Sequence, residues 1–227
     1  MKISLFSVVY MFLITLVFTS IVGAVKLLSE ERIERNQKAK LQKIILKVLT
    51  IPTDVKITNE ALIRLFENRV RSIRVQGRTL YVGYEADGRK LTGYAFPVGG
   101  PGFWGPIYGM VAVDSSGSVI KGIAFYKHSE TPGLGGRLTE DWFTEQFAGL
   151  PIFPVAGDKK IFYLKPEGSG QAPNELDAIT GATGTSRAVQ AFLNRELDLF
   201  LKRLWQPLKK AKIEVQRSTV QGSRFDK

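Results

Sequence analysis

Residues 177–187 read Asp-Ala-Ile-Thr-Gly-Ala-Thr-Gly-Thr-Ser-Arg, and apolar residues follow them at helical spacing: Val189, Phe192, Leu193 and Leu197. Glycines that alternate with hydroxyl residues ahead of such a stripe predict a loop feeding the start of a helix over residues 183–205, closed by Pro207. Backbone N–H groups at a helix start favour an anion, glycine lets the anion approach closely, and Arg187 could pair with a phosphate. The alternative is an N-cap with spare hydroxyls.

Two motifs in this chain resemble those of a known family. The run Asp177-Ala-Ile-Thr180-Gly181-Ala182-Thr183 resembles Asp-x-x-Ser/Thr-Gly-Ala-Thr, at which a flavin transferase attaches FMN through a phosphoester to the last threonine. Upstream, residues 128–136 read His-Ser-Glu-Thr-Pro-Gly-Leu-Gly-Gly and are similar to the family's Glu-Thr-Pro-Gly-Leu-Gly loop. The family is that of the FMN-binding domain, found in the C subunit of the sodium-pumping NADH:quinone reductase and the G subunit of the Rnf complex.

The resemblance implies that FMN is covalently bound to Thr183. It implies that Asp177 serves recognition by the transferase, and that no residue is catalytic; no metal-binding residue is expected. Other cofactor contacts are expected from the helix start, the upstream loop and an aromatic residue, namely Thr180, Gly181, Ala182, Thr185, Ser186, Glu130, Thr131, Gly133, Leu134, Gly135 and Trp104.

Some features leave alternatives open. A stretch similar to that around Trp104 lies beside the flavin domain's core in the quinone-reductase family, so Phe103 and Trp104 are expected to flank the flavin ring; Trp104 could instead be an ordinary core aromatic. Gly184 departs from the common pattern, where a larger residue follows the acceptor threonine, and it could loosen the helix start. Residues 104–108 and 134–136 lean toward the quinone-reductase type, whereas residues 180–189 lean toward Rnf.

The composition restricts the possible redox chemistry. The chain has 227 residues, 44% of them hydrophobic, with no cysteine and a single histidine, His128. Thiolate clusters, c-type haem attachment and multi-histidine metal sites therefore lack ligands within the chain. Redox chemistry would need an organic cofactor. A lone histidine indicates a polar residue at the rim of a pocket rather than an acid or base.

The net charge of +11 is unevenly distributed. Residues 26–50 hold seven basic and three acidic side chains, and residues 206–227 hold six basic and two acidic. Basic segments beside a membrane segment indicate contact with membrane lipid or acidic partners. No motif supports nucleic-acid binding, so we expect no nucleic-acid partner.

The N-terminus predicts a membrane anchor. Residues 3–25 carry no charge. This uncharged segment is long enough to cross a hydrocarbon core of roughly 30 Å as a helix. The alternative is a cleaved signal peptide with Val22-Gly23-Ala24 as its cleavage site, although the apolar run exceeds the usual length of about 7–15 residues. The positive-inside rule is weak for a long following domain. The resemblance implies a single-pass protein of the cytoplasmic (inner) membrane with its flavin domain on the periplasmic side.

The expected organisation is a transmembrane anchor (1–25), a juxtamembrane amphipathic helix (26–50), an FMN-binding domain (51–205) and a basic C-terminal tail (206–227). Its predicted fold class is α+β, with a twisted antiparallel sheet and flanking helices. Strands are expected over 79–85, 91–97, 110–114, 119–126 and 160–165, with a glycine-rich loop over 99–109 and a polar loop over 166–175. Helices are expected over 59–68 and over 139–147, the latter capped by Thr139.

The resemblance thus predicts an electron-transfer subunit of a membrane-bound, ion-translocating oxidoreductase of the Rnf or sodium-pumping NADH:quinone reductase type. It would relay single electrons through FMN on a threonine phosphoester, without independent substrate turnover. Its partners would be the other membrane subunits of the complex, a flavin transferase during maturation, and membrane lipid. The alternatives are a membrane-tethered module that binds flavin or another phosphorylated ligand non-covalently, and a cofactor-free assembly subunit.

Overall fold

The computed structural model describes residues 5–54, 56–155 and 157–210, and the chain divides into two compact units, Met1–Gln42 and Lys43–Lys227. Within the first unit runs most of helix α1 (Leu5–Val48). Its apolar part, Leu5–Glu30, is long and apolar enough to cross a membrane, and none of it is buried within the protein. The predicted apolar N-terminal helix is therefore confirmed; a signal sequence would pass the same test.

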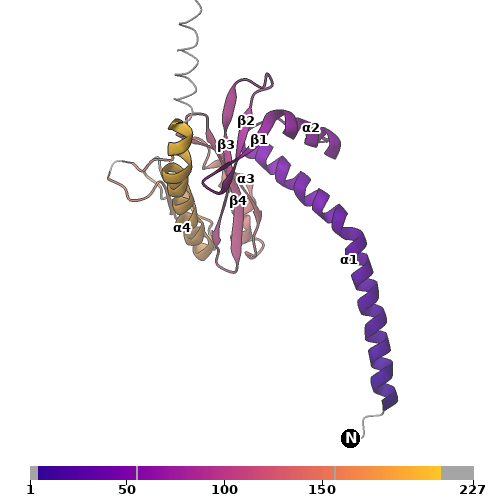
Figure 1. Cartoon of the computed structure of the whole chain (residues 1–227). Coiled ribbons are helices and arrows are strands. Elements are labelled where there is room, and N and C mark those ends of the chain that lie inside the picture. Colours follow the sequence, from indigo (N-terminus) through magenta and orange to yellow (C-terminus); the bar gives the residue numbers. More distant parts are fainter. Residues whose placement is uncertain (1–4, 55, 156, 211–227) are drawn as a thin grey trace, which may run out of the picture. The chain divides into compact units, whose positions relative to one another are not determined.

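The second unit is built on a five-stranded antiparallel sheet in which each strand pairs with the next along the chain (Figure 1). Hairpin connections of this kind need only short turns, such as those at Asp87-Gly88 and residues 115–117. The strands are β1 (Val70–Val75), β2 (Arg78–Tyr84), β3 (Leu91–Pro101), β4 (Pro106–Asp114) and β5 (Ile120–Lys127).

Helices complete the second unit. α2 (Asn59–Arg69) starts at Thr58, whose side chain accepts a hydrogen bond from the Ala61 amide. A 3₁₀ turn η1 (Gly135–Thr139) and the short helix α3 (Asp141–Glu145) follow β5. Near the C-terminus, α4 (Thr183–Leu199) continues into the π-helical turn η2 (Phe200–Trp205). With the antiparallel sheet, these helices confirm the predicted α+β class.

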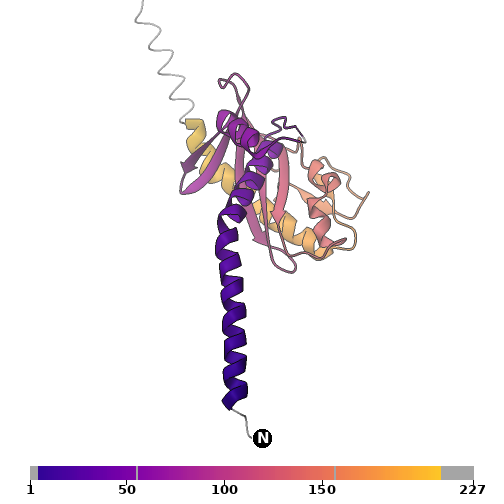
Figure 2. The ribbon, with the colours of Figure 1, turned by 90° about the vertical axis from the view of Figure 1, so that its right-hand side faces the viewer.

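The long helix α4 covers one face of the sheet (Figures 1 and 2). A Cβ on Gly100 of β3 would lie 2.8 Å from Cγ of Phe192, so glycine is required where the helix crosses the strand. Directly after α4, Phe200 stacks on Phe96 with ring centroids 4.5 Å apart. Close packing of these buried rings fixes the axis of α4, and with it the position of Thr183 at its start.

The opposite face of the sheet is also closely packed. A Cβ on Gly83 of β2 would meet Leu49 at 3.0 Å, and one on Gly122 of β5 would meet the Val48 carbonyl oxygen at 3.0 Å. Leu46 and Leu49 are fully buried. The sheet is thus covered on both sides, which accounts for the nearly continuous burial along the centre of β4.

The segment that leads into α4 is held by side-chain amides. β6 (Tyr163–Lys165) and β7 (Glu175–Asp177) form a two-stranded parallel sheet. From α4, Asn194 Oδ1 accepts the Ile161 amide at 2.7 Å and Gln190 Oε1 accepts the Leu164 amide at 2.6 Å. Gln146 bonds both backbone groups of Asp177. These amides substitute for a neighbouring strand and fix the path of the chain before Gly181.

Two expectations about the strands are wrong, and one strand was missed. The glycine-rich stretch 99–109 is mostly strand, because β3 runs to Pro101 and β4 starts at Pro106, with those two residues paired across the hairpin. β1 was not predicted, and the polar loop 166–175 ends in β7. The glycines permit close contact with other elements, which a local pattern does not reveal.

Two helix expectations are also wrong. The helix predicted over 139–147 is shorter, and Glu140 rather than Thr139 precedes α3. Helical structure continues through Pro207 to Lys210. The wider π turn of η2 ends at Trp205, two residues before Pro207, and the helix continues past the proline although that residue has no amide hydrogen to donate. Most of the predicted basic tail, residues 211–227, lies outside the described residues.

The β4–β5 turn supplies a pH-dependent prediction. Burial would raise the pKa of the Asp114 carboxyl, but hydrogen bonds from Ser116, Val119 and Ser118 outweigh burial and hold that pKa below its usual value. Because the carboxyl has a lower pKa in the folded state than in the unfolded state, its charged form stabilises the fold at pH values above the unfolded-state pKa. This stabilisation is lost as the pH falls through the folded-state pKa. We expect Asp114→Asn to lower the free energy of unfolding at pH 7 by about 1 kcal/mol and to flatten its decline in acid.

Denaturant unfolding of both proteins over a pH series would measure this difference. Ser116→Ala serves as the control, because it removes one donor and keeps the carboxylate, so it should retain the acid-dependent decline. Parallel pH curves for wild type and Asp114→Asn would contradict the assignment.

Candidate functional site

Thr183 is the first residue of α4, and the loop before it turns sharply. Gly181 has a φ of 78°, in the left-handed region that favours glycine, and Ala182 precedes the helix. The Ser186 amide bonds the Ala182 carbonyl at 3.0 Å, so the amides of the preceding turn point out of the helix end. The Thr183 side chain is exposed. A nucleophile or a modified side chain at this place would be accessible.

The neighbouring hydroxyls have protein partners. Thr180 Oγ1 donates to Glu167 Oε2 at 2.7 Å. Ser186 Oγ accepts the Ile179 amide at 3.0 Å and is buried. Thr185 Oγ1, also buried, donates to Glu130 Oε2 at 2.5 Å. Within the described part of the chain no hydrogen bond is recorded for the Thr183 hydroxyl, which distinguishes it from these three.

Glu130 connects the three segments around Thr183. Its carboxylate is buried, with a residue exposure of 4%. Oε1 accepts the backbone amides of Phe103 at 2.8 Å and Trp104 at 3.1 Å, while Oε2 accepts the Thr185 hydroxyl. One carboxylate therefore ties the β3–β4 turn and the loop that follows β5 to the first turn of α4.

The loop over residues 130–136 is a compact turn beside the helix start. The Thr131 carbonyl accepts the amides of Leu134 and Gly136 at 3.2 and 2.9 Å, and Gly133 has a φ of 73°. A Cβ on Gly135 would lie 2.8 Å from Glu130 Oε2, so this buried glycine brings the loop against the carboxylate. Thr131, Gly133 and Leu134 are exposed.

These segments enclose a cleft of about 380 Å³, within the range of roughly 300–1,000 Å³ typical of small-molecule sites. Two exposed aromatics form one wall: Phe103 is 61% and Trp104 68% exposed, and their rings meet edge to face at 5.1 Å. The alternative that Trp104 is a core aromatic is therefore wrong. The cleft is lined by Phe103, Trp104, Glu130, Thr131, Leu134, Gly135 and residues 181–185.

A second cleft of about 350 Å³ lies beside the same threonine. Thr180, Gly181, Thr183 and Ser186 line it, together with Arg187. Asp177 lines neither cleft; its carboxylate accepts the Gly168 amide at 2.9 Å and so holds the loop before the motif. The hydroxyls and glycines of the motif thus divide between two hollows that meet at Thr183.

His128 lies behind the loop rather than in the cleft. It is half-buried, and its Nδ1 accepts the Glu130 amide at 3.2 Å. The histidine therefore supports the residue that organises the site. Among the described residues, no group of three or more His, Cys, Asp or Glu side chains is arranged to hold a metal ion.

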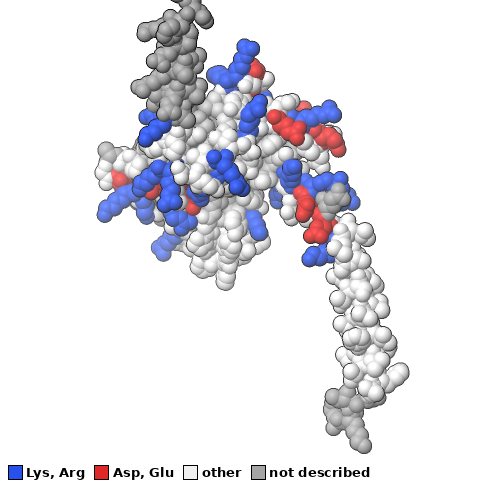
Figure 3. Space-filling view, in the orientation of Figure 1, with Lys and Arg blue, Asp and Glu red and all other residues white. Residues whose placement is uncertain are grey.

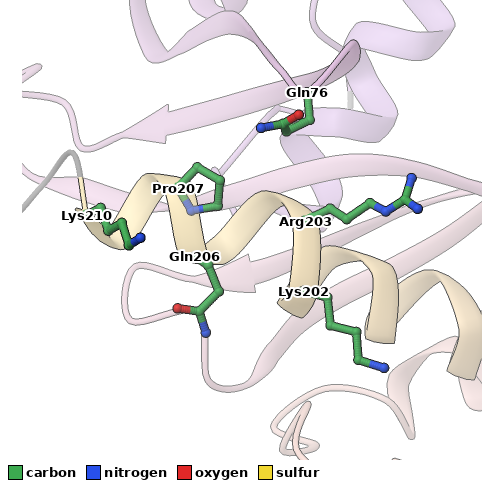
Figure 4. Close-up of a pocket in the computed structure, with 6 residues that line it drawn as sticks. All are labelled: Gln76, Lys202, Arg203, Gln206, Pro207 and Lys210. Carbon is green, nitrogen blue, oxygen red and sulfur yellow. The ribbon is translucent and has the colours of Figure 1, made fainter.

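A larger cleft, of about 590 Å³, lies toward the other end of the C-terminal helix (Figure 4). It is lined by Gln76, Lys202, Arg203, Gln206, Pro207 and Lys210. At 1.5 Å per residue, Lys202 lies on the order of 30 Å along the helix from Thr183. The lining of this larger cleft is cationic, whereas the lower end of the domain is uncharged in Figure 3. Figure 1, in the same orientation, shows the β3–β4 hairpin at that end. Size alone therefore does not identify the site.

The sequence predicted the members of the Thr183 cleft but not the role of Glu130. Glu130 was expected to contact the cofactor; it lines the cleft, and its carboxylate is bonded to three protein groups. The sequence signal is indirect: a glutamate inside a glycine-rich loop is a candidate for burial with backbone and hydroxyl donors.

Comparisons with known proteins agree with this geometry. Residues 102–198 match the FMN-binding domain family. The C subunit of the Na(+)-translocating NADH-quinone reductase of Yersinia pestis is 35% identical over 108 residues, which cover 48% of this chain and 41% of that protein. The protein of the same name from Vibrio anguillarum is 31% identical over 136 residues, covering 60% of this chain and 51% of that protein. The chain thus spans about half the length of these curated relatives.

Solved structures share the fold. The C subunit of the Na(+)-translocating NADH-quinone reductase of Parabacteroides distasonis superposes with a TM-score of 0.62 at 23% identity, covering 74% of this chain and 93% of that one. NqrC of Shewanella oneidensis gives 0.61 at 23% identity, covering 71% and 93%. The resemblance stated from the two motifs is confirmed for the domain, because the matched segment contains the β3–β4 turn, the loop over 130–136 and the start of α4.

Proposed function

We propose that this chain, which carries an FMN-binding domain over residues 102–198, is an electron-transfer subunit of a membrane-bound, ion-translocating oxidoreductase, with FMN covalently attached to Thr183. The observation that carries the proposal is the exposed Thr183 hydroxyl at a helix start that opens into a cleft with aromatic walls. The names of the curated relatives favour the NADH-quinone reductase type over the Rnf type.

The residues of the site fit a phosphorylated flavin. Outward-pointing amides at the start of α4 suit the phosphate, and Arg187 in the adjoining cleft supplies a positive charge. Phe103, Trp104 and Leu134 offer exposed apolar surface in the cleft of about 380 Å³. We infer that the ring lies in this aromatic cleft and the phosphate at the helix start between the two clefts.

FMN would supply the redox chemistry, and the protein's residues would bind and orient it. Attachment forms a bond between Thr183 Oγ1 and phosphorus, with loss of the hydroxyl proton and departure of the leaving group of an activated flavin brought by the transferase. Thr185 and Ser186 hold the helix start through Glu130 and the Ile179 amide. Thr180, Gly181, Ala182, Thr131, Gly133 and Gly135 would shape the backbone around the group, and Asp177 would serve recognition by the transferase.

A mass measurement tests the proposal directly. The full chain, produced together with a flavin transferase, is expected to be yellow, to fluoresce as a denatured band in a gel, and to be heavier by FMN less one water. A colourless protein of unmodified mass would favour the cofactor-free assembly role. Flavin that leaves on denaturation would favour the non-covalent binding module.

We further propose that residues 1–25 remain as a membrane anchor, followed by the juxtamembrane segment over 26–50, and that the domain over 51–205 faces the periplasm. The motivation is the apolar helix Leu5–Glu30 and the membrane complex named for the relatives. Membrane lipid, the other subunits of the complex and a transferase would be its partners.

N-terminal sequencing of membrane-extracted protein and protease treatment of spheroplasts would test both halves of this proposal. We expect the mature chain to start before residue 3 and the domain to be cleaved without lysis. A mature chain that starts at Val25 would contradict the anchor, and a domain protected until lysis would contradict the periplasmic orientation.

A further inference from the structure

Gly184 occupies an unusual position beside the acceptor threonine. A Cβ at this residue would lie 2.8 Å from Cε2 and 3.0 Å from Cγ of Phe103, and nearer still to Cδ2. The glycine has no positive φ, so backbone strain does not account for the absence of a side chain. The space that a side chain would occupy is filled by the Phe103 ring, although residue 103 lies in the β3–β4 turn, far away in sequence.

The Phe103 backbone is fixed where it meets the helix. Its amide and that of Trp104 both bond Glu130 Oε1, and Gly102 closes the turn by bonding the Gly105 carbonyl at 2.8 Å. Since the backbone is held, a side chain at residue 184 can be accommodated only by rotation of the ring toward solvent. That rotation would also break the perpendicular contact between the rings of Phe103 and Trp104.

We propose that Gly184 is the seat of the Phe103 ring and that the combined size of these two residues sets how closed the cleft beside Thr183 is. Phe103 and Gly184 are then positioning residues for the aromatic wall. The helix start is not loosened by its glycine, because the ring of residue 103 packs where a side chain would otherwise lie. Only the effect on a flavin attached to Thr183 rests on the proposed function.

A double-mutant cycle tests the seat without any cofactor. In the full chain carrying Thr183→Val, Gly184→Ala, Phe103→Ala and the double variant are compared by thermal unfolding. Alanine favours helix more than glycine does, so helix propensity alone would make Gly184→Ala stabilising. The clash of the new Cβ with the Phe103 ring acts in the opposite direction, and the double variant separates the two effects. We expect Gly184→Ala to lower Tm when Phe103 is present and to raise Tm when residue 103 is alanine. A rise in Tm in both backgrounds, or a fall in both, would contradict the proposal that the Phe103 ring packs in the space left by Gly184.

Iodide quenching of tryptophan fluorescence measures separately how open the cleft is. With Trp142→Phe in place, the fluorescence accessible to iodide comes from exposed Trp104, because Trp205 is buried. We expect Gly184→Ala to increase iodide quenching, and Phe103→Ala to increase it at least as much. Unchanged quenching in both variants would overturn the claim that this pair closes the cleft.

The flavin-loaded protein with Thr183 intact completes the test. We expect Gly184→Leu to keep the fluorescent denatured band but to change the one-electron equilibrium of the bound flavin about three- to tenfold, which corresponds to a midpoint shift of about 28–59 mV. An unchanged potential would overturn the positioning role toward the flavin. Absence of the fluorescent band from the wild-type protein would instead contradict the proposed attachment of flavin. The thermal double-mutant cycle would still test the packing of Phe103 on Gly184.

Discussion

Thr183→Val is expected to abolish covalent flavin while leaving the fold intact. Valine keeps the branched shape of threonine and removes the oxygen that would bond phosphorus. The side chain is exposed at the first residue of α4, and no hydrogen bond of its hydroxyl is recorded among the described residues. The free energy of unfolding should therefore change by less than about 0.5 kcal/mol. In-gel flavin fluorescence after denaturing electrophoresis, with intact mass, measures the loss.

Two neighbouring threonines serve as matched controls. Thr180→Val removes a bond to exposed Glu167, and Thr185→Val removes a buried bond to Glu130. Both variants should still carry flavin, with a lower yield at most, although Thr185→Val should lose about 1–2 kcal/mol of stability. A fluorescent band that persists in Thr183→Val, or that vanishes from Thr180→Val, would show that another residue carries the group.

Local sequence patterns predicted the elements whose burial follows a simple period. Strands β2 to β5 were expected because apolar residues and turn residues alternate there, and α4 because its apolar stripe has helical spacing. β1 has no such pattern: it is an edge strand in which Val70 is buried and residues 71–74 are exposed. It also follows α2 without a turn residue, so its pairing with β2 could not be read from local sequence.

Long-range contacts account for the other errors. Gly100 lies in a strand against which Phe192 of α4 packs, and Gly184 lies in the first turn of α4, where the Phe103 ring occupies the place of a side chain. Phe192 lies far from Gly100 in sequence, so the glycines of residues 99–109 alone suggested a loop. β7 likewise depends on Gln146, which bonds its backbone from outside the strand.

The sequence predicted which residues belong to the candidate site, but not how they are arranged. Motif resemblance placed Thr183, the loop over 130–136 and Trp104 together, and the structure brings them to one cleft. It could not show that Thr185 and Ser186 are buried against protein partners. Spacing indicates which hydroxyl residues are near a helix start, but only the fold determines which of them are exposed.

Glu130→Ala is expected to have the largest effect on stability among the cleft substitutions. It removes the acceptor for two backbone amides and for the buried Thr185 hydroxyl. Leaving the buried Thr185 hydroxyl without its charged acceptor costs about 1.5–3 kcal/mol of stability. The two backbone amides lie in an exposed turn, where water can replace part of the lost hydrogen bonding. We expect a loss of about 3 kcal/mol, or about 6–12 °C in Tm for a domain of this size.

Glu130→Gln separates hydrogen bonding from simple space filling. Its carbonyl oxygen can still accept both amides, and its amide group can donate to the Thr185 oxygen. We therefore expect glutamine to retain most of the stability that alanine loses. Glu167→Ala is the control for loss of an exposed carboxylate, with an expected change within about 0.5 kcal/mol. Equal Tm values for the alanine variants at 130 and 167 would mean that the buried carboxylate does not hold the three segments together.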